Sequence, residues 1–288
     1  MEVLIIAIVE GILLGSVYGL GAMGLSLIFG IMGIINLVHG EFLMLGAFTC
    51  FWLWFLLGMN PIGATFVAML VIAALAAFLY KVAIFRVVGK FPLLSRVLTF
   101  GLAIFLWNFS EFAFSSTFRS VNYPTGSIGF LGSYLSVNKI ICFVVALIIA
   151  GVLFASLKWT RIGKALRAAS QNPRVALISG INIHRIRLLS YAMGGALAGI
   201  AGGLIAIQWA ICPSIGQDLI LKCFAMVALG GLGSLPGALL GGVFLGIAES
   251  VGTMYWGATI AGVIAPLTVI AVFIFRPQGL WGVVERVD

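Results

Sequence analysis

The chain has 288 residues, of which 62% are hydrophobic and only 8% are charged, and its mean hydropathy is +1.23. These values exclude a water-soluble domain of ordinary composition. A net charge of +8 could attract nucleic acid, but such binding would require a solvated basic face with aromatic side chains for stacking. The orientation of a membrane protein, whose basic loops stay in the cytoplasm, explains the charge more simply.

Apolar runs, most of them long enough to cross a bilayer, recur along the chain near residues 3–29, 40–58, 62–80, 97–115, 138–157, 188–210, 219–230, 237–254 and 257–275. Runs such as ICFVVALIIAGVLF lack the alternation of a barrel strand, and helices satisfy their own backbone. The pattern predicts an all-α, polytopic membrane protein with 8–10 spans, some broken or re-entrant, in one transmembrane domain over residues 1–288.

The first run begins MEVLIIAIVEGILLG, without the basic segment of a cleaved signal peptide, so it is predicted to be a retained span. Its length leaves room for a second crossing hidden within it. The run 219–230 is short for a span and precedes GGLGSLPGALLGG, which allows a tilted, broken or re-entrant helix there.

The stretch IMGIINLVHGEFLMLGAF, residues 31–48, places Asn36, His39 and Glu41 between two apolar runs. The surrounding glycines lower helix propensity and predict a helix that breaks within or near the membrane. Such breaks are tolerated where they line a polar cavity, so the three residues are candidates for a translocation path. The alternative is that they only join two helices through interhelical hydrogen bonds.

Two stretches carry most of the basic residues and, by the positive-inside rule, are predicted to be cytoplasmic. One is the loop with Lys81, Arg86, Lys90 and Arg96, and the other contains Lys158, Arg161, Lys164, Arg167, Arg174, Arg185 and Arg187. Residues 116–138 contain one arginine and many turn formers, and are predicted to lie outside.

The cytoplasmic stretch 158–187 has the composition of a folded segment rather than a linker. Residues 161–170 are good helix formers, and Asn172 followed by Pro173 indicates the start of a second short helix, 173–179, ended by Gly180. The two short helices meet in an elbow, residues 161–180, whose small residues and arginines suit contact with a protein partner. The alternative is an amphipathic helix lying on the membrane surface.

Several other residues allow a functional or a purely structural interpretation. Glu249 is the stronger candidate for a path, Glu10 is weaker, and Glu111 is close to the outer end of its span. Asp218 and Lys222 are four apart and could pair on one helix, and no chemistry is assigned to them.

Three further patterns are assigned to packing. The glycine repeats Gly11–Gly15–Gly19, Gly195–Gly199–Gly203 and Gly242–Gly246 suit packing within one bundle, with a subunit interface as the alternative. The aromatics of CFWLWF, residues 50–55, are predicted to anchor at the membrane interface rather than to form a substrate cage. The cysteines are predicted to be buried and bind no metal: Cys50, Cys142, Cys212 and Cys223.

Four separated stretches resemble, in the expected order, the permease subunits of branched-chain amino acid ABC transporters. They are GIINLVHGEFLMLGAF, GKALRAASQNPRVALISGINIHRIR, KCFAMVALGGLGSLPGALLGGVFLGIAES and FRPQGLWG. The resemblance implies a non-enzymatic transport subunit of an ATP-driven importer for branched-chain or other small hydrophobic amino acids. No lysine is followed by Ser or Thr, so the phosphate loop G-x-x-x-x-G-K-[ST] is absent and other chains must hydrolyse ATP.

The resemblance makes 158–187 the loop that couples to the ATPase, through Arg161, Gly163, Lys164, Arg167, Ala168, Ala169, Gln171, Asn172 and Gly180. Glu249 also matches a position of the family. With Asn36, His39 and Glu41 it completes the set of candidates for the translocation path. The implied partners are two ABC ATPase subunits carrying ATP and Mg²⁺, a second identical or related permease, an extracytoplasmic substrate-binding protein and membrane lipid. This chain itself is expected to hold no cofactor, metal or nucleic acid.

The implied location is the bacterial or archaeal cytoplasmic (inner) membrane, with a cytoplasmic C-terminus. Alternatives are a related ABC permease for urea or short amides and an ion-coupled secondary carrier, which would leave the basic elbow without a partner. A channel is disfavoured because the second of two Asn-Pro pairs lies in a basic loop. An intramembrane enzyme would need a nucleophile and base, or a metal, which the sequence does not suggest.

Overall fold

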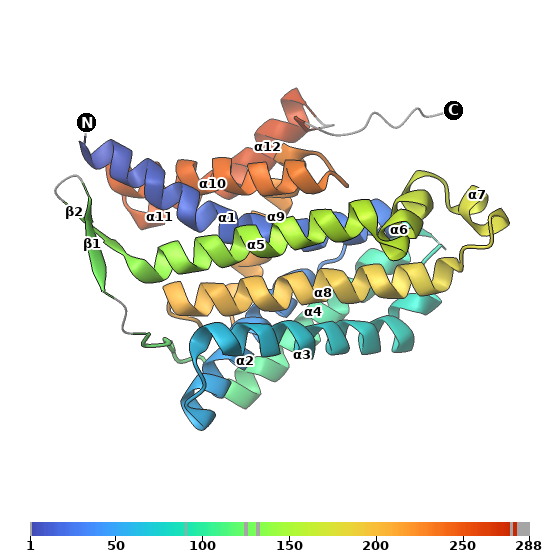
Figure 1. Cartoon of the computed structure of the whole chain (residues 1–288), viewed down its shortest axis with the longest axis horizontal. Coiled ribbons are helices and arrows are strands. Elements are labelled where there is room, and N and C mark those ends of the chain that lie inside the picture. The colour runs from blue at the N-terminus through green and yellow to red at the C-terminus, as the bar shows by residue number, and fades with distance from the viewer. Residues whose placement is uncertain (1, 90, 124–125, 131–132, 277–278, 281–288) are drawn as a thin grey trace.

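The computed structural model describes residues 2–89, 91–123, 126–130, 133–276 and 279–280. They form an elongated bundle of helices with one small hairpin (Figure 1). In chain order the elements are α1 (Glu2–Met32), α2 (His39–Leu57), α3 (Pro61–Val82), the 3₁₀ turn η1 (Ile84–Arg86), α4 (Pro92–Phe114), β1 (Ser127–Phe130), β2 (Ser133–Ser136), α5 (Val137–Trp159), α6 (Arg161–Gln171), α7 (Pro173–Ile178), α8 (Ile183–Gln208), α9 (Ile215–Gly230), α10 (Leu235–Trp256), α11 (Ala258–Ala261) and α12 (Ile264–Phe275).

Within the described residues, eight segments are helical, long enough and apolar enough to cross a membrane. This confirms the prediction of an all-α, polytopic membrane protein. The first run is a single continuous helix of 31 residues, so it conceals no second crossing. The short run 219–230 belongs to α9, an unbroken helix of 16 residues that is not among the eight. The antiparallel β1–β2 hairpin between α4 and α5 is an addition that the sequence pattern does not predict.

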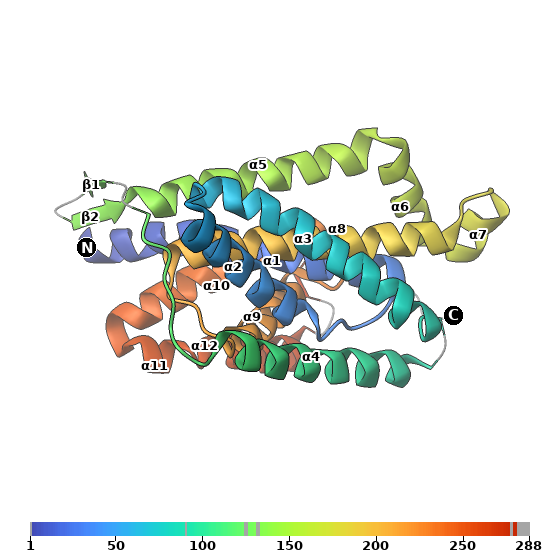
Figure 2. The same cartoon turned by 90° about the horizontal axis from the view of Figure 1, so that it is seen from below.

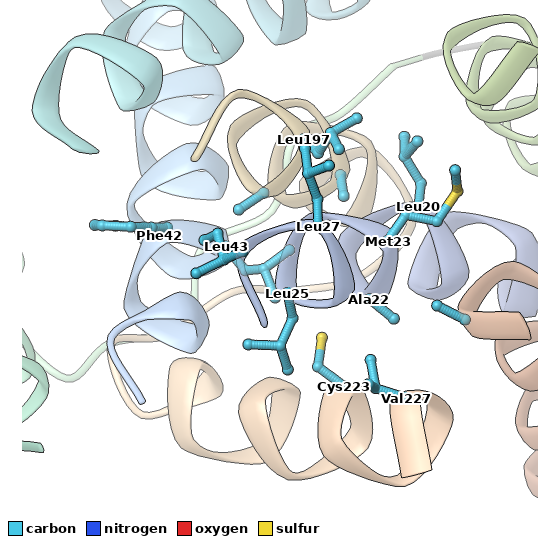
Figure 3. Close-up of a cluster of buried hydrophobic side chains, with 14 of the residues drawn as sticks. Leu20, Ala22, Met23, Leu25, Leu27, Phe42, Leu43, Leu197, Cys223 and Val227 are labelled. Carbon is cyan, nitrogen blue, oxygen red and sulfur yellow. The ribbon is translucent and has the colours of Figure 1, made fainter. Parts of the chain in front are cut away.

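Helix α1 is the centre of the bundle and packs against α10, α8, α5 and α9. Its residues from 15 to 28 are all buried, and Figure 3 shows several of them beside side chains of α2, α8 and α9. A β-carbon at Gly15 would collide with the Gly242 carbonyl of α10. The glycine repeats of α1 and α10 therefore pack against each other within one chain, as predicted. The α8 repeat likewise faces α3, where Gly199 meets the Ala68 carbonyl.

The two ends of the bundle differ in composition. Helices α6 and α7 lie at one end, together with the turn between α3 and α4, and β1 and β2 lie at the other (Figures 1 and 2). Both basic stretches are thus at the same end, and the segment predicted to be external is at the opposite end. Lys90, residues 124–125 and residues 131–132 of these loops lie outside the described residues.

Three short breaks within the described residues separate consecutive helices that lie inside the bundle. Residues 33–38, in which Gly33 has φ +64°, separate α1 from α2. Residues 231–234 separate α9 from α10, and Gly257 separates α10 from α11. The first confirms the break predicted around Asn36. After α12, the backbone N–H of Leu280 donates to the Leu229 carbonyl at the end of α9. Residues 277–278 and 281–288, including half of the FRPQGLWG motif, lie outside the described residues.

Candidate functional site

The helix break at 33–38 brings Asn36 and His39 against two neighbouring helices. The Tyr191 hydroxyl of α8 donates to Asn36 Oδ1 at 3.0 Å, and His39 Nε2 lies 2.8 Å from the Gly21 carbonyl of α1. Because a carbonyl only accepts, His39 carries its proton on Nε2. Both residues are fully buried, and Gly24 leaves the space that the imidazole fills. Asn36 and His39 therefore hold the start of α2 onto α1 and α8.

Glu41 lies near the start of α2, where that helix crosses the start of α9. Its carboxylate lies against Gly216, where a β-carbon would sit 2.8–2.9 Å from the carboxylate atoms. Glu41 is 3% exposed, and its Oε2 has no hydrogen-bond partner within the part of the chain that the structure describes. The N-terminal end of α9 carries a partial positive charge from the helix dipole, and it favours a negative charge on the Glu41 carboxylate.

The fourth predicted path residue, Glu249, is on a different side of the bundle. Its Oε2 is 2.7 Å from Lys222 Nζ, which joins α10 to α9. The ammonium group also lies 3.5 Å from the Tyr18 hydroxyl and 4.8 Å from the centre of the Tyr18 ring on α1. Glu249 is only 7% exposed, and a buried charge of this kind is tolerated where it is paired.

The pair that Asp218 and Lys222 could form is not among the ion pairs of the described residues, because Lys222 turns toward Glu249. Spacing along one helix favours Asp218 as the partner of Lys222. However, α10 packs against α9 and offers Glu249 as a more buried partner. Sequence reasoning also missed Lys222 and Tyr18 as site residues. A signal was present, since a lysine inside an apolar run needs a counter-charge that another apolar run must supply.

A cavity of about 690 Å³ lies beside this pair, lined by α1, α5, α8, α9, α10, α11 and α12. It occupies the half of the bundle nearest the hairpin, because its walls include the N-terminal half of α1 and the C-terminal end of α8. A second ion pair, Lys139 Nζ to Glu10 Oε1 at 2.7 Å, also lines it. Asn36, His39 and Glu41 are not among its lining residues, so the structure does not bring the four path candidates together.

The elbow at the other end has the local structure predicted from its sequence. The Thr160 hydroxyl accepts from the backbone N–H of Gly163 at 2.9 Å and starts α6. The Asn172 side chain starts α7 in the same way, because its Oδ1 accepts from the backbone N–H groups of Arg174 and Val175 at 3.0 and 3.1 Å. These caps confirm the two short helices predicted for residues 161–170 and 173–179.

The elbow also packs tightly against the helix that precedes it. A β-carbon at Gly163 would collide with the backbone of α5 at Ser156, so α6 folds back closely on α5. Pro173 is the first residue of α7, where its missing N–H costs no helical hydrogen bond. Gly180, at φ +81°, follows the end of α7 and lets the chain turn toward α8.

The elbow is packed on one face and open on the other. Leu166, Ala169 and Ala176 are at most 3% exposed and pack into the bundle, and Gly163 is also buried. Of the residues predicted to contact an ATPase, Ala168 is half-buried, and the exposed ones are Arg161, Lys164, Arg167, Gln171, Asn172 and Gly180. Gly163 and Ala169 thus shape the elbow from inside, and the others form its open surface.

A second cavity, of about 550 Å³, lies between α7 and the start of α8. Leu177, Ile181 and Ile183 supply apolar walls, and Arg174 and Arg187 supply positive charge. The side chains at the end of α7 beside it are also largely exposed. The elbow therefore presents apolar and cationic groups together on its open face.

The aromatic stretch 50–55 contacts the segment between α4 and α5 at Arg119. The Arg119 guanidinium lies 5.5 Å from the centre of the Phe51 ring and 4.9 Å from that of Trp52. Its Nη2 also donates to the Phe114 carbonyl at 2.9 Å. Arg119 thus ties the segment between α4 and α5 to the end of α2 through cation–π contacts, which sequence spacing does not predict.

Comparison with known proteins agrees with this architecture. Residues 7–275 match the family model described as branched-chain amino acid transport system / permease component. The chain is 33% identical to the high-affinity branched-chain amino acid transport system permease protein BraD of Pseudomonas aeruginosa, over 96% of this chain and 94% of that protein. It is 31% identical to the corresponding permease protein LivH of Escherichia coli, over 95% and 94%.

An archaeal relative and a solved structure are also similar. The probable branched-chain amino acid transport permease protein LivH of Methanocaldococcus jannaschii is 31% identical over 96% of this chain and 92% of its own. The solved structure of PsaBC from Streptococcus pneumoniae in complex with Fab gives a TM-score of 0.48 at 14% identity, over 93% of this chain and 91% of that chain. From the family model and the near-complete coverage of the relatives, this chain belongs to the branched-chain amino acid transport system permease family.

Proposed function

We propose that the chain is the membrane-spanning permease subunit of an ATP-driven importer for branched-chain or other small hydrophobic amino acids. Relatives that match nearly the whole chain are branched-chain amino acid transport permease proteins by name, which supports this substrate class. The protein lies in the inner membrane with a second permease subunit, identical or related. It receives substrate from an extracytoplasmic binding protein and is driven by two separate ATPase subunits that hold ATP and Mg²⁺.

The observation that carries the proposal is the elbow formed by α6 and α7. Its buried residues fasten it to α5 and the bundle, while Arg167, Gln171 and their neighbours on the open face are exposed. A rigid segment of this kind transmits the movement of a bound ATPase to the membrane helices, because close-packed helices move as units rather than deforming. A carrier driven by an ion gradient has no partner that would use it.

The basic surface of the elbow also supports an orientation of the chain in the membrane. The elbow and the other basic loop lie at one end, and positively charged short loops stay in the cytoplasm. The last described residues lie beside the end of α9, next to the turn in which Gly233 contacts Gly30 of α1. This arrangement supports a cytoplasmic C-terminus.

The experiment is site-specific photocrosslinking in membranes of the native host. A photoreactive residue at Gln171 is expected to capture a nucleotide-hydrolysing chain, identified by mass spectrometry. The matched control is Phe112, which is 90% exposed near the opposite end of the bundle. Capture of an ATPase at Gln171 but not at Phe112 supports the proposal. Capture at neither site, combined with uptake by the purified chain alone, would show a carrier instead.

A further inference from the structure

Beside the cavity at Lys222 and Glu249, one carboxylate oxygen has no hydrogen-bond partner among the described residues. Glu249 Oε2 binds Lys222, but Glu249 Oε1 is buried and has no hydrogen-bond partner among the described residues. The Gln208 side chain also lines the cavity. Buried polar atoms without partners are uncommon and indicate a ligand or ordered water.

Charges of both signs surround the same space. Lys139 and Lys222 supply two cations, and Glu10, Asp218 and Glu249 supply three anions. The cavity combines these charges with apolar walls that include Leu14, Ile205, Leu219 and Ala265. Its volume of about 690 Å³ lies within the range of roughly 300–1,000 Å³ that is usual for small-molecule sites.

We infer that this cavity binds the amino acid itself, as a zwitterion, during transport. The substrate carboxylate binds the Lys222 ammonium and the Tyr18 hydroxyl, and the substrate ammonium binds Glu249. The aliphatic side chain lies against the apolar wall. This assignment rests on the proposed function and adds to it the place in the permease where the substrate is recognised.

A zwitterion suits this site better than an ion of either sign. Inserting it between Lys222 and Glu249 replaces one ion pair by two and leaves the net charge of the cavity unchanged. A simple anion would compete for Lys222 and leave Glu249 unpaired, and a simple cation would do the reverse. An unpaired charge in a largely buried site is unfavourable, so each of these ions would bind more weakly.

The same arrangement keeps the binding weak. The substrate must displace a contact that the protein already makes, so part of each new interaction offsets the loss of the Lys222–Glu249 pair. A path that releases its substrate quickly requires binding of this kind. After release, the two side chains pair again and satisfy each other's charge.

The test measures protection of a reporter cysteine in the intact complex, purified from its host and held in nanodiscs without the binding protein. Ser250 lines the cavity next to Glu249, so Ser250→Cys is alkylated and its rate is read by peptide mass spectrometry. The probes are L-leucine, the anion 4-methylpentanoate and the cation 3-methylbutylamine. Leucine at about twice its Kd is expected to slow alkylation about threefold. The two ions are expected to leave the rate nearly unchanged at the same concentration.

The variants separate binding from packing. The double change Lys222→Met with Glu249→Gln removes both charges together, leaves no unpaired partner and is expected to abolish protection. Glu111→Gln, on α4 outside the cavity, is the matched control and keeps it. Equal protection by all three solutes, protection that survives in the double variant, or no protection by leucine would each overturn the inference.

Uptake driven by ATP, measured on the same preparations with the binding protein added, distinguishes two failures. Normal leucine uptake without protection would contradict only the cavity assignment. Absence of amino acid uptake by the unmodified complex would contradict the proposed function itself.

Discussion

At the residue scale, the positions of charges in this protein follow from the cost of burying them. Lys222 lies in an apolar helix and Glu249 in another, and the two side chains pair at 2.7 Å. The Glu10–Lys139 pair repeats this arrangement between α1 and α5. Charged side chains inside a membrane bundle are retained where they pair or act on a substrate.

Removing one member of the Lys222–Glu249 pair should cost more than removing both. Lys222→Met leaves a buried carboxylate without its partner and is expected to lower the free energy of unfolding by on the order of 3 kcal/mol. Adding Glu249→Gln should restore most of that loss. Thermal unfolding of the two variants in detergent measures the difference. Equal stabilities of the single and double variants would show that an unpaired Glu249 carboxylate does not destabilise the fold.

At the element scale, the elbow combines a strong local fold with firm attachment. Side-chain caps at Thr160 and Asn172 start its two helices, and Gly163 permits the close contact with α5. The buried residues of α6 then hold it against the bundle. Its shape is therefore set before any partner binds, which reduces the entropy lost on docking.

Reversing one charge on the open face of the elbow should uncouple transport without unfolding the subunit. Arg167→Glu replaces an exposed cation, and substrate-stimulated ATP hydrolysis by the assembled complex is expected to fall at least about tenfold, as for loss of a charged interface contact. Arg96→Glu, an exposed arginine at the same end of the molecule, is the matched control. Stimulated hydrolysis at the normal rate in Arg167→Glu would contradict the assigned role.

At the scale of the whole molecule, α1 passes through the middle of the bundle, and its contact with α10 depends on glycine. The two backbones approach so closely that side chains are excluded at Gly15 and Gly242. In a membrane, helix association relies on such close packing, because lipid is as apolar as the helix surface. Helices at the periphery, such as α4, instead expose large apolar side chains.

An alanine at Gly15 should therefore separate the two helices, whereas one at Gly101 should be harmless. No atom lies within 4 Å of a β-carbon built at Gly101 on α4. Gly15→Ala is expected to destabilise the protein by roughly 1–3 kcal/mol through overpacking, and Gly101→Ala to change its stability little or raise it slightly. The unfolding temperatures in detergent compare the two. A larger loss for Gly101→Ala would contradict the packing described for α1 and α10.

The local structure around the elbow could be predicted because its signals act over a few residues. Asn172 followed by Pro173 favours a helix start through local capping alone, and Gly180 favours an end. The partners of charged residues could not be predicted in this way. Spacing of one turn pairs Lys222 with Asp218, but the helix packing brings Glu249 to it from 27 positions away.

The amino-acid sequence by itself determined the class of this protein, the positions of its helices and the end at which its basic loops gather. Those properties depend on local hydrophobicity, caps and charge, which act along the chain. Only the tertiary structure decided that Asn36 and His39 hold helices together while Glu249 lines a cavity. The physical reason is that the environment of a buried polar group is set by the neighbouring helices, which are distant in sequence.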